Sequence, residues 1–291
     1  MSVGLFRIVL PEGSVRLARG APEAGPTELL PATLSIDALL AGTAESFREA
    51  VRSSPGEGPV PEGAAIRAPI ESQEVWGAGV TYLRSREGRE EESELDAGIY
   101  GRVYAAGRPE VFFKSAGWRV RGPREPIGVR SDSAWNAPEP ELALVLTAGM
   151  EVAGYAIGND VSSREIEGEN PLYLPQAKIY DGSCALGPAV VVDPDDGPPF
   201  DIRLAVVRDG SEAYAGATTT GRMKRSFDEL ASCLGSALEF PVGAVLLTGT
   251  GIVPDRDFTL RPADVVRIEI DGLGTLENAV VAAGRAAPAA G

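Results

Sequence analysis

Residues 138–146 read Pro-Glu-Pro-Glu-Leu-Ala-Leu-Val-Leu, and Gly158-Asn159-Asp160 closes the next apolar run along the chain. Because side chains alternate along a strand with a period of two, Glu139 and Glu141 are expected to project from one face. A turn between the two apolar runs would pair them as a hairpin and bring Asp160 beside the glutamates. Clustered carboxylates repel one another unless a hard cation such as Mg²⁺ neutralises them. The pattern therefore predicts either a metal site or a polar strand edge with solvated acids.

The composition is that of a globular protein, with 44% apolar and 24% charged residues in a chain of 291. Its 42 acidic and 27 basic side chains give a net charge of −15, which argues against nucleic acid or an anionic membrane as a partner. The stretch Met1–Leu10 lacks a secretory signal pattern, and no apolar run reaches the roughly 18 residues of a membrane span. Cys184 and Cys233 have no paired spacing, as in proteins of a reducing compartment. We therefore expect a cytoplasmic protein.

The chain contains no histidine. This excludes sites that depend on an imidazole, among them Ser-His-Asp and Cys-His arrangements and zinc held by histidine. Proton transfer is then left to carboxylates, lysine, tyrosine and metal-bound water.

Composition and patterning divide the chain into two expected units. Residues 1–70 are predicted to form a small N-terminal α/β domain, with a helical pattern over 35–53 that Ser35 caps. Residues 71–282 are predicted to form the catalytic domain, and 283–291 a frayed tail. Many short strands and few helices indicate an α+β, mostly β fold with mixed sheets. The strands are predicted at Gly4–Leu10, Val15–Leu17, Val75–Val80, Val111–Lys114, Leu142–Leu146, Val152–Ile157, Ala189–Val192, Ile202–Arg208, Val245–Thr248 and Asp264–Ile270.

Two further helices are predicted, at Tyr82–Leu95 and Ser226–Leu238. Within the first, the segment Leu83–Leu95 is crowded with charge, and Arg86 and Glu90 stand four residues apart. It is either a solvated helix or a lid that brings an arginine onto a carboxylate substrate, which a guanidinium can bind bidentately.

A series of short motifs resembles the fumarylacetoacetate hydrolase superfamily over about residues 71–282. In chain order the motifs are Gly79-Val80-Thr81-Tyr82, Phe112-Phe113-Lys114, Glu139-Pro140-Glu141-Leu142, Gly158-Asn159-Asp160-Val161-Ser162-Ser163-Arg164, Lys178-Ile179-Tyr180-Asp181-Gly182, Leu186-Gly187-Pro188, Leu247-Thr248-Gly249-Thr250 and Gly274-Thr275-Leu276-Glu277-Asn278. The resemblance implies a mixed β-sheet roll or barrel-like catalytic domain and a homo-oligomer, either a dimer or a tetramer. It also implies a divalent-metal enzyme that acts on 2-oxo acids or related diketones.

The resemblance assigns the metal, Mg²⁺ or Mn²⁺, to Glu139, Glu141 and Asp160. It places Lys178 beside the metal and Thr275 in the substrate pocket.

The sequence departs from the hydrolases of the superfamily at one motif. These typically carry Tyr-x-x-His-x-x-Glu, whose His and Glu activate water, whereas here Tyr82 is followed by Ser85 and Gly88 at those positions. The segment Ile166–Lys178 is instead similar to the branch that dehydrates 2-keto-3-deoxy sugar acids, such as the arabinonate dehydratases. We therefore expect a hydro-lyase that converts a 2-keto-3-deoxy-pentonate to 2,5-dioxopentanoate by loss of a C3 proton and the C4 hydroxyl.

Two residues are candidates for proton transfer. Lys178 near a dication would favour its neutral form and could accept the C3 proton. Glu110 precedes a strand and is either a catalytic acid or base or an exposed loop acid. The residues expected to bind the substrate are Ser85, Arg86, Asn170, Tyr173, Thr250 and Thr275.

Other functions remain compatible with these residues. A metal-dependent oxaloacetate decarboxylase, or an acylpyruvate or diketo-acid hydrolase of the same superfamily, is the main alternative. A binding protein stabilised by a metal, without turnover, is the second.

Overall fold

Two large β-sheets form the body of the molecule in the computed structural model, which describes residues 2–84 and 97–284. The main sheet is mixed, since β15 runs parallel to β5 and other neighbours are antiparallel. Its strand order is β3 (Gly25–Leu29), β2 (Val15–Ala21), β1 (Val3–Val9), β12 (Cys184–Val192), β10 (Val152–Asp160), β9 (Pro140–Leu146), β15 (Ala244–Leu247), β5 (Glu74–Gly79) and β6 (Glu110–Ala116), with β4 (Ala65–Arg67) paired to β1.

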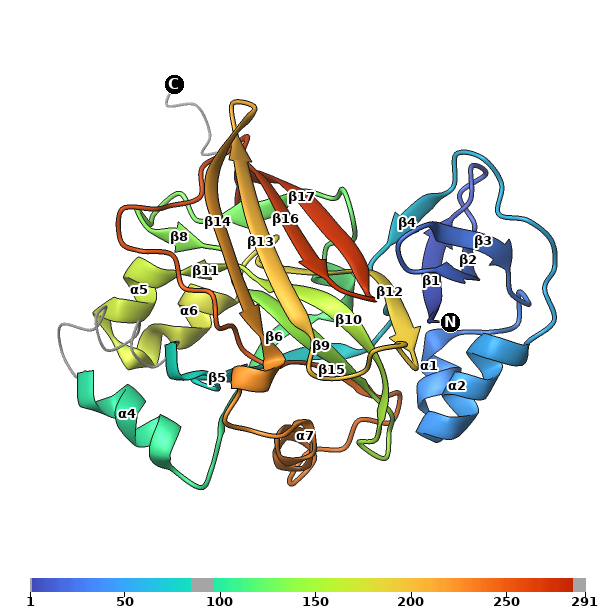
Figure 1. The fold of residues 1–291 in the computed structure, drawn as a ribbon, viewed down its shortest axis with the longest axis horizontal. Helices are drawn as coiled ribbons and strands as arrows, with labels where there is room; N and C mark the ends of the chain where they lie inside the picture. The colour runs from blue at the N-terminus through green and yellow to red at the C-terminus, as the bar shows by residue number, and fades with distance from the viewer. Residues whose placement is uncertain (1, 85–96, 285–291) are drawn as a thin grey trace.

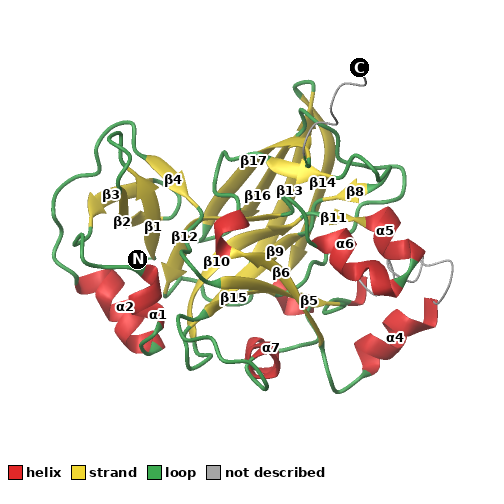
Figure 2. Cartoon of the chain, turned by 180° about the vertical axis from the view of Figure 1, so that it is seen from behind, coloured by secondary structure: helices red, strands yellow, loops and turns green. Residues whose placement is uncertain are grey.

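The second sheet stands against the middle of the main sheet (Figure 1). Its order is β14 (Ser211–Thr219), β13 (Asp201–Arg208), β16 (Val265–Ile270), β17 (Gly274–Ala282) and β7 (Ile127–Val129), and β8 (Asn136–Ala137) pairs with β11 (Ser162–Ser163) in a short ladder. The α-helices with bounds inside the described residues are α1 (Ile36–Leu40), α2 (Ala44–Ser53), α4 (Ala97–Ala105), α5 (Arg164–Glu169), α6 (Leu174–Lys178) and α7 (Phe227–Leu234). Figure 2 shows α1 and α2 at one end of the molecule and α4, α5 and α6 at the other.

The central strands are buried on both faces, which explains their unbroken apolar sequences. On β9, Leu142 and Leu144 pack into a cluster with the second sheet and α7. Ala143 and Val145, which alternate with them, pack into a second cluster with α1 and α2. The period of two in the sequence thus corresponds to two apolar cores on opposite faces of one sheet.

The predicted hairpin is confirmed. β9 and β10 pair antiparallel, with Gly158 opposite Glu141 and Asn159 opposite Pro140. The backbone N–H of Asp160 donates to the carbonyl of Glu139 at 2.9 Å. This register fixes Asp160 beside the two glutamates.

Each of the ten predicted strands overlaps an observed one, but the helical pattern over 35–53 is two helices. Ser35 caps α1 as predicted, and this helix ends at Leu40. A second helix, α2, then begins after Thr43, which caps it with a capping box. The helix predicted over Ser226–Leu238 ends at Leu234, where Gly235 follows. The helix predicted over Tyr82–Leu95 lies mostly outside the described residues. Strand β14 was not predicted, because its small and polar residues show no clear apolar strand pattern. Strand β17 was likewise not predicted from the sequence.

A mostly β fold with mixed sheets is confirmed, and the sheets of the described residues do not form a closed barrel. In the described ranges the main sheet runs open from β3 to β6, because β1 adds the N-terminal strands to β12 instead of closing the sheet.

The N-terminal segment shares a sheet and a core with the rest of the chain. Val3 lies opposite Val192 in the pairing of β1 with β12, and Phe47 of α2 is fully buried in the cluster that includes Ala143 and Val145. The division into units 1–70 and 71–282 stays a prediction, and most of the predicted tail falls outside the described residues.

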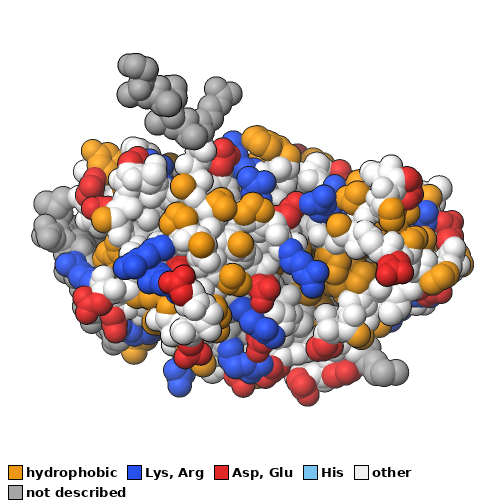
Figure 3. All heavy atoms as spheres, turned by 90° about the horizontal axis from the view of Figure 1, so that it is seen from above, with side chains coloured by type: hydrophobic (Ala, Val, Ile, Leu, Met, Phe, Trp, Pro, Cys, Tyr) orange, Lys and Arg blue, Asp and Glu red, His pale blue; other side chains and the backbone are white. Residues whose placement is uncertain are grey.

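The surface and the cysteines agree with the composition. No helix in the described ranges is long and apolar enough to cross a bilayer. On the face in Figure 3, basic and acidic side chains are interspersed, although the chain as a whole is acidic. Cys184 and Cys233 are free, and burial raises the pKa of the Cys184 thiol to about 12.

Candidate metal centre

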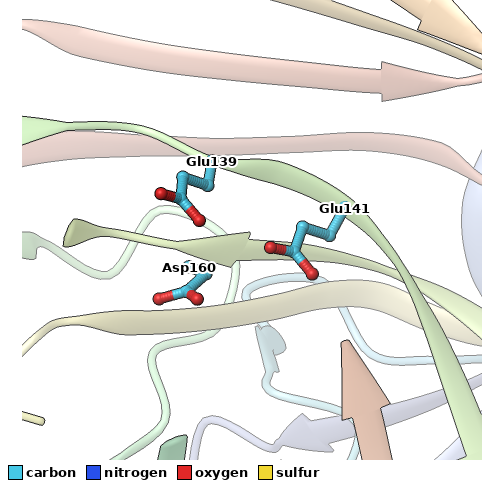
Figure 4. Close-up of side chains that lie close together, drawn as sticks. All are labelled: Glu139, Glu141 and Asp160. Carbon is cyan, nitrogen blue, oxygen red and sulfur yellow. The ribbon is translucent and has the colours of Figure 1, made fainter. Parts of the chain in front are cut away.

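The candidate metal ligands lie together at one edge of the main sheet. Strands β9 and β6 begin there, and β10, β15 and β5 end there. Glu139 and Glu141 therefore meet Asp160, and Figure 4 shows the three carboxylates close together, with the glutamates coming from one stretch of chain. One ligand oxygen of each lies within 4.8 Å of the others, and none of the three residues is more than 3% exposed. The alternative of a solvated strand edge is therefore wrong.

Three buried cations surround this carboxylate triad. Arg164 Nη2 lies 2.8 Å from Glu139 Oε1, and Lys178 Nζ lies 2.8 Å from Glu139 Oε2. Lys178 Nζ also lies 3.0 Å from Asp160 Oδ2, while Lys114 pairs with Asp160 Oδ1. Glu139 and Asp160 are thus each held by two cations.

Glu141 lies in a different environment. Its Oε2 accepts a hydrogen bond of 2.5 Å from the backbone N–H of Gly249, in the loop after β15. Burial raises the pKa of Glu141 well above its usual range, and the negative charges of Asp160 and Glu139 raise it further. A dication at the triad would reverse this penalty, and three carboxylates are the hard oxygen donors that Mg²⁺ and Mn²⁺ prefer. The residues present fit such a metal.

Lys178 sits beside the triad, as the resemblance implies. It ends α6, and its Nζ donates to Glu139 Oε2, Asp160 Oδ2 and, at 2.7 Å, Ser162 Oγ. The carbonyl of Lys178 accepts from Lys114 Nζ at 2.5 Å. Both ends of Lys178, its amine and its backbone, are therefore anchored at the metal centre.

Glu110 begins β6 at the same sheet edge, opposite Gly79 of β5. A Cβ on Gly79 would lie 2.1 Å from Glu110 Oε2, so the missing side chain makes room for this carboxylate. Glu110 shares a face of β6 with Phe112, whose ring centroid is 5.5 Å from Lys178 Nζ. Glu110 is half-buried, and its role toward a substrate stays a prediction.

Three predicted substrate residues have local structural contacts. Asn170 accepts from the N–H of Leu172 at 2.9 Å and caps the short 3₁₀ helix Pro171–Tyr173. Tyr173 is 40% exposed. The Thr250 hydroxyl is buried in the loop after β15 and bonds within its own turn to Ile252. Their roles toward a substrate stay predictions.

The structure does not bring Thr275 together with the triad. It lines a separate cavity of about 720 Å³ between β17 and the N-terminal strands, and no triad residue is among the described residues that line it. Ser85, Arg86 and most of the predicted lid lie outside the described residues. Arg84, just before them, lies 3.7 Å from the carboxylate of Asp255.

Sequence reasoning gave little weight to two residues that contact the triad. Lys114 is fully buried in β6, and its signal is a lone lysine in the strand Glu110–Ala116, which holds two phenylalanines. Arg164 follows Asp160 by four residues, in one of the motifs that carry the family resemblance. It forms the ion pair with Glu139, and Ser163 supplies the cap of α5.

Comparisons with known proteins agree with this geometry. Residues 89–281 match the family described as "Fumarylacetoacetate (FAA) hydrolase C-terminal". A "Probable 2-keto-3-deoxyxylonate dehydratase" of Haloferax volcanii is 51% identical over 73% of this chain and 73% of its own. A "2-dehydro-3-deoxy-D-arabinonate dehydratase" of Saccharolobus solfataricus is 46% identical over 72% of each chain.

A solved structure extends the similarity over nearly the whole fold. It is of "2-keto-3-deoxy-D-arabinonate dehydratase complexed with magnesium and 2,5-dioxopentanoate", with 36% identity and a TM-score of 0.80. The match covers 96% of this chain and 98% of that one.

We predict that Glu141→Gln weakens Mg²⁺ binding by at least about tenfold, since even residues that only support a metal ligand are worth 10–100-fold in affinity. Glutamine keeps an oxygen that can accept from Gly249 but loses the charge. Calorimetric titration with Mg²⁺ measures the change, and Glu277→Gln, which removes an exposed carboxylate on β17, is the control. Equal affinity in the Glu141 variant and the wild type would assign Glu141 to structure alone.

Proposed function

The chain belongs to the fumarylacetoacetate hydrolase family, and on that premise we propose that it is a Mg²⁺-dependent hydro-lyase, a dehydratase of a 2-keto-3-deoxy-pentonate. The observation that carries this is a buried carboxylate triad with a lysine bonded to two of its members, in a chain without histidine. The similarity to dehydratases of 2-keto-3-deoxy sugar acids supports the choice of substrate class.

The reaction removes water between C3 and C4. Loss of a C3 proton and of the C4 hydroxyl leaves a C3–C4 double bond conjugated with the 2-oxo group. A proton shift from C5 to C3 then gives the C4–C5 enol, and transfer of the enol hydroxyl proton to C4 completes 2,5-dioxopentanoate. When bound, Mg²⁺ supplies Lewis-acid stabilisation of the negative charge that develops as the C3 proton leaves.

In the proposed mechanism, two side chains of the protein transfer protons to and from the substrate. Lys178 Nζ, held at the triad, takes the C3 proton. Glu110, on the same side of β6 as the contact with Lys178, gives a proton to the departing C4 hydroxyl. The exchange of these two roles is the alternative, because a carboxylate and an amine can each take or give a proton. No water has to be activated, so the missing His-Glu pair does not impair this reaction.

The proposal also covers the location of the protein, its oligomeric state and its contacts with the substrate. The enzyme is cytoplasmic and acts as a homo-oligomer on a small anionic substrate. The two free cysteines are consistent with a reducing compartment. Asn170, Tyr173, Thr250 and the predicted lid are retained as candidate contacts for the substrate hydroxyls and carboxylate.

We predict that the protein releases water, and not CO₂, from a 2-keto-3-deoxy-pentonate, and that EDTA abolishes this activity reversibly. A panel of 2-oxo acids with and without Mg²⁺, followed by mass spectrometry, measures it. Oxaloacetate and an acylpyruvate in the panel test the decarboxylase and hydrolase alternatives directly. Loss of CO₂ from oxaloacetate without any dehydration, or full activity in metal-free protein, would contradict the proposal.

We predict that Lys178→Met lowers kcat by about 10²-fold or more, the scale of lost acid–base catalysis, while Mg²⁺ still binds. Methionine keeps much of the side-chain volume but removes the amine. Turnover within a few-fold of wild type would place the base elsewhere.

Glu110 is tested by a matched pair of variants. Glu110→Gln removes its proton, and Gly79→Ala displaces its carboxylate by placing a methyl group where Oε2 lies. Both should lower kcat and spare Mg²⁺ affinity. Wild-type kinetics in both variants would assign Glu110 to the surface.

A further inference from the structure

Two members of the carboxylate triad are paired with cations of the chain itself. Lys114, Lys178 and Arg164 contact Glu139 and Asp160 directly, and none of the three cations is more than 2% exposed. Glu139 and Asp160 are therefore neutralised inside one buried cluster.

Ion pairing lowers the free-energy cost of burying Glu139 and Asp160 in the folded protein. An isolated charge buried in a protein costs far more free energy than a paired and hydrogen-bonded one. Because cations already pair with Glu139 and Asp160, the folded state does not need a metal to neutralise these two carboxylates. The metal centre can therefore exist, and exchange its ion, without unfolding.

The same ion pairs oppose the binding of a divalent cation on its own. A divalent cation that enters this cluster adds positive charge beside Lys114 and Arg164, which already neutralise Asp160 and Glu139, within a region of low dielectric. A 2-oxo acid brings one negative charge and two further oxygen ligands, its carboxylate and its 2-oxo group. The anion offsets part of the excess that the metal creates.

We propose that Lys114 and Arg164 act as built-in counter-ions of the triad, so that Mg²⁺ binds weakly alone and tightly together with an anionic 2-oxo acid. The inference rests on the proposed function for the class of anion. It adds to that function a thermodynamic coupling between the metal and the substrate, which must be equal in both directions.

Lys114 is the counter-ion best placed for a test. It pairs with Asp160 Oδ1, whereas Lys178 bonds the other oxygen, Oδ2. Its remaining hydrogen bonds go to the carbonyls of Val161, at 3.1 Å, and Lys178. Lys114 thus contributes charge to the cluster and leaves Asp160 Oδ2 untouched.

The experiment is a calorimetric titration of the full chain with Mg²⁺, alone and at saturating pyruvate. Pyruvate carries the carboxylate and the 2-oxo group but no C4 hydroxyl to lose. We expect pyruvate to tighten Mg²⁺ binding by roughly tenfold or more, within the usual range of coupling between sites. Methyl pyruvate, which lacks the charge, should tighten it far less. Equal Mg²⁺ affinity with and without pyruvate would overturn the proposal.

Lys114→Met tests the role of the counter-ions. Removing one positive charge should tighten the binding of Mg²⁺ alone several-fold and shrink the effect of pyruvate. Arg208→Met is the matched control, because it takes the cation from Asp264, a buried carboxylate at the start of β16, and should change neither value. Weaker Mg²⁺ binding in Lys114→Met with an undiminished pyruvate effect would overturn the proposal.

If Lys114→Met folds poorly without metal, thermal unfolding with and without Mg²⁺ replaces the calorimetric titration of this variant. Mg²⁺ should then raise the Tm of this variant more than that of the wild type, and an equal or smaller rise would contradict the counter-ion role. The product assay separates the two proposals. Dehydration of the sugar acid without coupled binding overturns this inference alone, whereas coupled binding without dehydration overturns the proposed function alone.

Discussion

The mutual repulsion of three carboxylates buried at one sheet edge is the constraint to which the surrounding structure responds. Water cannot solvate Glu139, Glu141 and Asp160, so their charge has to be met by neighbouring groups. Lysine and arginine side chains from β6, α6 and the start of α5 supply that charge. Glu141, with a backbone donor and a raised pKa, is the member of the triad with most to gain from a metal.

The fold places these groups by simple means. Central strands buried on both faces form a rigid platform, and the hairpin of β9 and β10 aligns the glutamates with Asp160. Two strands away, Gly79 leaves space for the carboxylate of Glu110. Charged side chains lie at the ends of the strands, whereas the apolar middle of each strand holds the sheets together. This separation explains how an acidic site coexists with a large core.

Much of this could be predicted from the sequence, because it depends on short-range patterns. The alternation around Glu139 and Glu141 predicts the face they share, and two apolar runs predict the hairpin that adds Asp160. What the sequence does not show depends on long-range packing. The route of β1 onto β12, which keeps the main sheet open, leaves no local pattern, and neither does the cavity that Thr275 lines. The contacts of Lys114 depend on β6, β10 and α6 meeting in space, so spacing along the chain could not reveal them.

The proposed chemistry needs a divalent ion at the triad, and a crystal soaked with Mn²⁺ and pyruvate tests for that ion most directly. Anomalous diffraction at the manganese edge locates the ion independently of the protein atoms. We expect one strong peak bounded by carboxylate oxygens of Glu139, Glu141 and Asp160, at distances of about 2.0–2.2 Å, close to those of the smaller Mg²⁺. A crystal of active enzyme with manganese bound elsewhere, and no peak at the triad, would contradict the account.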